Sequence, residues 1–103
     1  MSYDIIITYT KSAESPANAF STIPKFSASQ LGITQEQIDN VLQSYPLLDY
    51  EIRTVDNLLI IQLSYASKEV MDNRLATPEM ILFLQATSEW MTANHITRTV
   101  REV

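Results

Sequence analysis

Few side chains in this sequence have the types and spacing that acid–base, nucleophilic or metal chemistry requires. His95 is the only histidine and there is no cysteine. This excludes a two-histidine mechanism, a thiolate nucleophile and a cysteine-based zinc site. His95 comes at the end of a helical pattern, where its partial positive charge favours the negative end of the helix dipole. We therefore expect it to cap that helix.

Asp49 and Glu51 form the second group that could do chemistry. They alternate on an expected strand, so both carboxylates lie on one face, about 7 Å apart. No neighbouring apolar pocket is indicated that would tune them for general acid catalysis. One glycine in 103 residues excludes a glycine-rich phosphate loop, and no Gly-x-Ser-x-Gly elbow occurs. The sequence thus predicts no catalytic, cofactor-binding or metal-binding residue.

The size and composition are those of a packed globule. A chain of 103 residues with 46% hydrophobic content can bury one core, so we expect one α+β domain over residues 1–103. The first residues, MSYDIIITYTKS, have no basic region and only three consecutive isoleucines. We expect neither a signal peptide nor a membrane span, and we expect a cytoplasmic protein.

The first half of the chain contains one strand pattern and two closely spaced helix starts. Residues 3–10 predict an interior strand, because both of its faces are apolar. Residues 11–26 predict a loop, with a short helix near 17–22. Ser27 with Gln30, and Thr34 with Gln37, have the spacing of capping boxes. Gly32 suits the left-handed residue that ends the first of these helices, and Pro46 ends the second, which runs over 34–45.

Residues 48–65 predict a hairpin closed by the two-residue loop Asp56-Asn57. Its register should place three pairs on one apolar face: Tyr50 with Leu63, Ile52 with Ile61, and Thr54 with Leu59. The other face carries a second apolar cluster of Val55, Leu58 and Ile60. That cluster must be covered by another strand, a helix or a partner.

The last third begins with a polar connection over residues 66–76. Thr77-Pro78-Glu79 then starts a helix that ends near residues 94–95. Its apolar stripe, interpreted as core, is Met80, Phe83, Leu84, Thr87, Trp90 and Met91. Residues 96–103 are β-prone but weakly patterned, which leaves open an edge strand or a frayed tail.

Two architectures fit this order of elements. The first is a ferredoxin-like βαββαβ arrangement, with a small antiparallel sheet, two main helices on one face and the second face open. The second rests on Ala28, Gly32, Ile33, Ile38 and the hairpin, which together resemble a winged helix with an added amino-terminal strand and carboxy-terminal helix. The well-patterned first strand favours the ferredoxin-like order.

Charge is the main indication of function. The chain has a net charge of −5, and the outward positions of the 34–45 helix are Glu36, Asp39, Asn40 and Gln43. Carboxylates beside phosphates oppose nucleic-acid binding, so we do not expect it. We expect these four residues to bind a protein with a basic surface. Val55, Leu58 and Ile60 complete the predicted protein-binding set, and pairing of two copies through the sheet would cover them.

We therefore predict a non-catalytic, acidic protein-interaction domain, a small regulator or inhibitor that binds a basic protein surface. Two alternatives remain open. One is a winged-helix DNA-binding transcriptional regulator that dimerises through its last helix. The other is a small dimeric ferredoxin-like enzyme with its pocket between helix and sheet.

Overall fold

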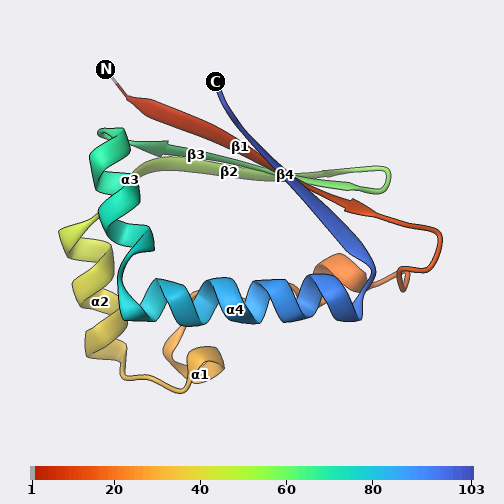
Figure 1. The fold of residues 1–103 in the computed structure, drawn as a ribbon, viewed down its shortest axis with the longest axis horizontal. Coiled ribbons are helices and arrows are strands. Elements are labelled where there is room, and N and C mark those ends of the chain that lie inside the picture. The colour runs from red at the N-terminus through yellow and green to blue at the C-terminus, as the bar shows by residue number, and fades with distance from the viewer. Residues whose placement is uncertain (1) are drawn as a thin grey trace.

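The computed structural model describes residues 2–103, which are built around a four-stranded antiparallel sheet (Figure 1). The strands are β1 (Tyr3–Lys11), β2 (Leu47–Val55), β3 (Leu58–Tyr65) and β4 (Ile96–Glu102), in the order β2-β3-β1-β4. The predicted α+β class and ferredoxin-like order are confirmed. The winged-helix alternative is wrong, because β1 pairs with both the hairpin and β4 and so completes a full sheet.

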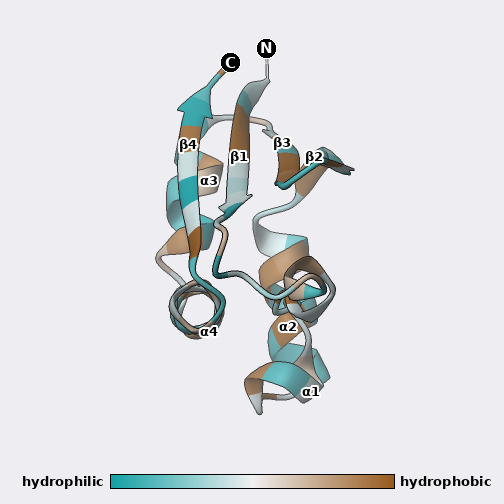
Figure 2. Cartoon of the chain, turned by 90° about the vertical axis from the view of Figure 1, so that its right-hand side faces the viewer, coloured by the Kyte–Doolittle hydropathy of each residue, from teal (hydrophilic) through white to brown (hydrophobic). Residues whose placement is uncertain are grey.

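The helices lie on one side of this sheet, below it in Figure 1. They are the 3₁₀ turn η1 (Ala19–Thr22) and the α-helices α1 (Ala28–Leu31), α2 (Gln35–Ser44), α3 (Lys68–Leu75) and α4 (Pro78–Ala93). Helix α4 runs under the sheet, with α2 and α3 near its first turn. We call the sheet face toward the helices the inner face and the opposite one the outer face. Figure 2 shows hydrophobic residues concentrated on the central strands β1 and β3.

The predicted helix starts are present. The Ser27 side chain accepts a hydrogen bond from the backbone N–H of Gln30, and Thr34 and Gln37 form a complete capping box. Gly32 has φ 67° and ψ 31°, the left-handed conformation that ends α1. These devices are local, so each helix begins where the sequence indicates.

The predicted hairpin register is also confirmed. Tyr50 opposes Leu63, Ile52 opposes Ile61, and Thr54 opposes Leu59. Asp56 in the connecting loop has φ 52°, which an Asp-Asn loop tolerates. The register places the three pairs on the inner face, while Val55, Leu58 and Ile60 lie on the outer face.

Residues 66–76 differ from the prediction, because they form helix α3 and not only a polar connection. The Ser67 side chain caps it by accepting from the Val70 backbone N–H. Met71 is buried against Ile5 and Tyr65. The Ser67 cap was the available signal, but a helix of eight residues is marginal without such packing.

Residues 96–102 form the edge strand β4, so the alternative of a frayed tail is wrong. The strand pairs with β1 from Ile5↔Glu102 to Lys11↔Ile96. Backbone hydrogen bonds to an interior strand therefore order a segment whose side-chain pattern is weak.

The core consists of two clusters at opposite ends of α4. One contains Tyr9, Ala19, Leu59, Trp90 and Ile96, and the other contains Ile5, Tyr65 and Met71. The Trp90 indole donates to the Ala19 carbonyl and the Thr22 hydroxyl, both at 3.1 Å. Between the clusters, the space under the middle of the sheet is only partly filled. None of the helices in residues 2–103 has the length and apolar character needed to cross a membrane.

Candidate functional site

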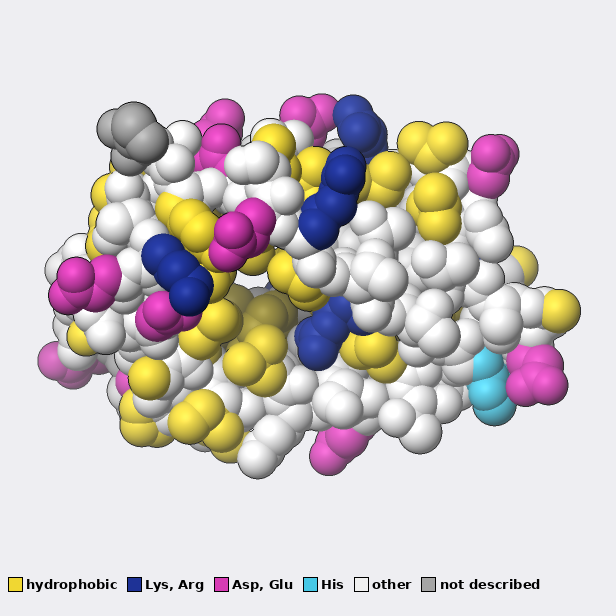
Figure 3. Space-filling model, turned by 45° about the horizontal axis from the view of Figure 1, so that its top comes forward, with side chains coloured by type: hydrophobic (Ala, Val, Ile, Leu, Met, Phe, Trp, Pro, Cys, Tyr) yellow, Lys and Arg dark blue, Asp and Glu magenta, His cyan; other side chains and the backbone are white. Residues whose placement is uncertain are grey.

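Two adjoining cavities lie between the inner face of the sheet and the helices. The β4 cavity is walled by β1, β4 and α4 and has a volume of about 520 Å³. The β2 cavity is walled by β2, β3, residues 23–26 and α2, and has a volume of about 500 Å³. They share walls from β1, β3 and α4. Figure 3 shows a hollow on the surface, with hydrophobic side chains in its depth and charged side chains around its rim.

A short side chain in the middle of α4 helps to create this space. Thr87 lines both cavities and is only 2% exposed. Its hydroxyl donates to the Phe83 carbonyl one turn earlier, at 2.9 Å. A threonine at this core position fills less volume than a leucine and leaves its polar atom satisfied within the helix. Helix α4 therefore supports the sheet at both ends and leaves a gap between them.

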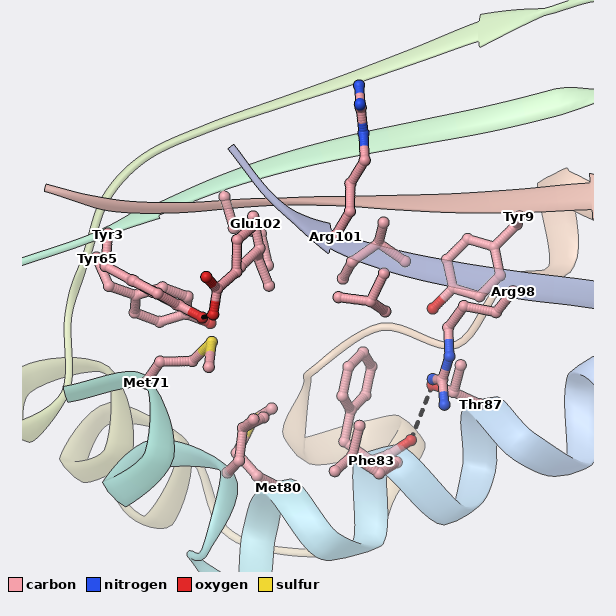
Figure 4. Close-up of a pocket in the computed structure, with 16 residues that line it drawn as sticks. Tyr3, Tyr9, Tyr65, Met71, Met80, Phe83, Thr87, Arg98, Arg101 and Glu102 are labelled. Atoms are coloured by element: carbon pink, nitrogen blue, oxygen red, sulfur yellow. Dashed lines mark hydrogen bonds between the residues drawn. The ribbon is translucent and has the colours of Figure 1, made fainter. Parts of the chain in front are cut away.

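A tyrosine–carboxylate pair closes one end of the β4 cavity. The Tyr3 hydroxyl donates to Glu102 Oε1 at 2.5 Å, and Figure 4 shows both side chains beside Tyr65. The hydrogen bond to Glu102 raises the pKa of Tyr3 to about 12, with desolvation and nearby negative charge adding to the effect. At neutral pH Tyr3 is therefore a hydrogen-bond donor to the Glu102 carboxylate.

Arg98 marks the other end of the β4 cavity. It projects from β4 toward Thr87 on α4, near Tyr9 (Figure 4). Within residues 2–103 the only close contact between a basic side chain and a carboxylate joins His95 and Glu14, so Arg98 has no carboxylate partner there. Arg98 and Glu102 are four residues apart on one strand, which separates their Cα atoms by about 13 Å. The cavity thus has a cation at one end and a carboxylate at the other, with apolar walls between them.

Two largely buried tyrosines also line this space. Tyr9 and Tyr65 line both cavities and are 5% and 3% exposed. Neither hydroxyl is hydrogen-bonded to another residue in the described part of the chain. Burial raises the pKa of Tyr65, which keeps it protonated. Both hydroxyls are therefore available to a bound molecule.

The residues predicted to bind protein lie elsewhere, in two separate groups. Glu36, Asp39, Asn40 and Gln43 are exposed on α2, and none lines either cavity. Val55 and Leu58 face each other on the outer face, with Ile60 farther along β3. Val55 is 46% exposed, and no helix of residues 2–103 covers this cluster.

The residues first considered for chemistry also lie outside the cavities. His95 follows α4 with φ 55°, and its Nδ1 is 3.3 Å from Glu14. Asp49 and Glu51 are exposed on the outer face of β2. Within residues 2–103, no group of three or more His, Asp or Glu side chains is placed to hold a metal ion.

Sequence reasoning missed Tyr3, Tyr65, Arg98 and Glu102 as a set. Tyr3 opposes Tyr65, and Tyr9 opposes Arg98, only because β1 pairs with β3 on one side and β4 on the other. The alternation of Arg98, Val100 and Glu102 was the available signal. It carries meaning only if residues 96–102 form a strand, which the sequence left open.

The raised pKa of Tyr3 predicts a late ionisation. The folded state favours the protonated phenol, so the associated stability is present below pH 10 and is lost as the pH rises through about 12. In a near-ultraviolet absorbance titration, the difference between wild type and Tyr3→Phe should be an ionisation near pH 12. Glu102→Gln should move that ionisation to lower pH. A Tyr3 ionisation that stays at the same pH in Glu102→Gln would contradict this assignment.

No family model matches this sequence, and no curated protein is significantly similar to it. Solved structures share the fold. A conserved Bacteroides thetaiotaomicron protein, described as of unknown function and a possible oxidoreductase, has a TM-score of 0.61 at 10% identity, with 99% of this chain and 95% of that chain covered. A Deinococcus radiodurans protein provisionally named an antibiotic biosynthesis monooxygenase has a TM-score of 0.59 at 18% identity, with 100% and 90% covered.

A third similar structure is SnoaB, described as a cofactor-independent oxygenase from Streptomyces nogalater. Its TM-score is 0.56 at 14% identity, with 99% of this chain and 90% of that chain covered. At such identities the likeness establishes the fold.

These comparisons overturn the predicted function. The prediction of a non-catalytic regulator or inhibitor was wrong, because the proteins that share the fold include one named as an oxygenase, one provisionally named a monooxygenase and one described as a possible oxidoreductase. A basic protein partner finds no support. The findings favour the third alternative, a small ferredoxin-like enzyme with its pocket between helix and sheet.

Proposed function

We propose that this protein is a small oxygenase of the cofactor-independent kind, acting on a flat, apolar substrate in the β4 cavity. One observation carries the proposal. An apolar cavity of about 520 Å³ has the Glu102 carboxylate at one end and the unpaired Arg98 guanidinium at the other. The names of structures with the same fold support this reaction class.

Oxygenation without a cofactor requires a substrate that supplies the electrons itself. An aromatic ketone with an acidic methylene can do so, because loss of a proton gives an anion that reduces O2. The overall change is CH2 plus O2 to C=O plus water, which balances without another reductant. Glu102 would accept the proton, and Arg98 would stabilise the negative charge that develops on the substrate oxygen.

Oxygen uptake tests this proposal. Anthrone, a flat tricyclic ketone with one acidic methylene, is a suitable first probe within a panel of similar ketones. We expect the protein to accelerate uptake above the protein-free rate, with one O2 consumed for each new ketone formed. The variant Glu36→Gln should retain the full rate, because Glu36 is exposed on α2 and does not line the cavity. Uptake at the protein-free rate across the panel would contradict the proposed function.

We also propose that two copies of the chain pair through their outer sheet faces. Val55, Leu58, Ile60 and Ile6 form an apolar area on this face, and no helix of residues 2–103 covers it. Glu51, Gln62, Ile6 and Arg101 form one row across the four strands. A two-fold axis parallel to the strands places β2 of one copy over β4 of the other. Glu51 of each copy then meets the partner's Arg101, so the charges at both edges are complementary.

A further inference from the structure

The β2 cavity contains a buried cation that the proposed reaction does not use. Arg74, in the last turn of α3, is 6% exposed and lines this cavity. Among the described residues the only close contact between a basic side chain and a carboxylate lies elsewhere, at His95 and Glu14, so Arg74 has no carboxylate partner. Burial lowers the pKa of Arg74, as expected of a cation that lacks a counter-charge. An arginine buried without an acidic partner is costly and rare.

The protein satisfies only part of the Arg74 guanidinium. Nη1 donates to the Tyr45 carbonyl at 3.1 Å, which caps the end of α2. The Nε atom is buried and has no partner among residues 2–103. The guanidinium also lies 5.8 Å from the centre of the Phe26 ring. A guanidinium has five N–H donors, so one carbonyl oxygen leaves most of its capacity unused. Capping of α2 therefore does not account for this residue.

The lining of the β2 cavity has the opposite charge to the protein. Arg74 and Lys25 both line it, and no Asp or Glu does, although the net charge of the chain is −5. The remaining walls are largely apolar and aromatic, with the Tyr65 hydroxyl also available. This combination suits a molecule with an apolar body and one anionic group.

We propose that the β2 cavity binds a flat apolar carboxylate, whose anionic group is held by Arg74. This site deepens the proposed function and rests on it, because the substrate cavity and the β2 cavity share Tyr9, Tyr65 and Phe83. A substrate that extends across both would place its carboxylate by Arg74 and its reacting carbon in the β4 cavity. A flat molecule with a carboxylate can also bind without reacting.

Calorimetry with 2-naphthoate and its neutral isostere 2-naphthamide tests the inference. Wild type should bind 2-naphthoate at least about tenfold more tightly, since a hydrogen bond to a charged group is worth about ten- to a hundredfold in affinity. Arg74→Met should weaken 2-naphthoate by the same factor and leave 2-naphthamide unchanged. The affinity of Arg74→Lys for 2-naphthoate should fall between those of wild type and Arg74→Met, because lysine keeps the charge and loses the forked geometry.

Arg53→Met is the matched control, because it removes the same charge from exposed β2. It should leave both affinities unchanged. Equal affinity of wild type for the two probes would overturn the inference. So would a loss of affinity for 2-naphthoate that is the same in Arg53→Met as in Arg74→Met. If Arg74→Met does not fold, the affinities of wild type for the two probes and those of Arg74→Lys decide the outcome. Preference for 2-naphthoate with no oxygen uptake would reject the proposed function alone, whereas oxygen uptake without this preference would reject the carboxylate site alone.

Discussion

Glu102→Gln is expected to lower kcat for substrate oxidation by about a hundredfold or more, the usual effect of losing a positioned general base. Glutamine keeps the size of the side chain, and its carbonyl can still accept from Tyr3. Substrate binding should therefore change little, so that KM stays near the wild-type value while kcat falls. Steady-state oxygen uptake over a range of substrate concentrations measures both constants.

Glu89→Gln is the control for this variant. Glu89 is exposed on α4 and lines neither cavity, so the same chemical change should leave both constants intact. Tyr3→Phe adds a second comparison, because it removes the hydrogen bond that orients Glu102 and leaves the carboxylate in place. We expect a smaller loss than in Glu102→Gln. A Glu102→Gln enzyme with more than about a tenth of wild-type kcat would show that another group accepts the proton.

Ile60→Lys is expected to convert the proposed dimer into monomers. Ile60 lies on β3 between Arg53 on β2 and Thr8 on β1, near the middle of the outer face. In a two-fold assembly each copy would bury a lysine without a counter-charge. Such a charge costs about 3–5 kcal/mol, or more than a hundredfold in the dissociation constant. Sedimentation velocity over a concentration series measures the shift.

The control for Ile60→Lys makes the same substitution away from the sheet. Ile81 on α4 is 46% exposed and lines neither cavity, so Ile81→Lys should leave the assembly unchanged. The thermal stability of the Ile60→Lys monomer should exclude unfolding as the cause of dissociation. A monomeric wild type, or a dimer that persists in Ile60→Lys, would contradict pairing through the outer face.

The parts of the fold that could be predicted are those whose causes are local. Thr34 and Gln37 cap α2 through atoms three residues apart, and the loop at Asp56 sets the register of the hairpin. The Thr77-Pro78 start of α4 is local in the same way. Helix α3 and strand β4 could not be identified because distant residues stabilise them. Met71 packs on Ile5 and Tyr65, and β4 pairs with a strand from the other end of the sequence.

The function prediction failed for a related physical reason. Net charge describes the exposed surface, to which Glu36 and Asp39 contribute, whereas a cavity is lined by the few side chains that point inward. In this protein the inward-facing cations Arg74 and Arg98 have the opposite sign to the whole chain. Arg74 is buried, and burial removes the solvent that screens its charge, so this cation counts for more in the site than an exposed carboxylate does.

The sequence by itself determined where most helices and strands begin and the register of the hairpin, and it favoured the ferredoxin-like order of the elements. These features depend on hydrogen bonds and apolar patterns within a few residues. Only the tertiary structure decided which side chains share a cavity. Tyr3, Tyr65 and Glu102 come from three separate parts of the chain, and they meet because β1 pairs with both β3 and β4.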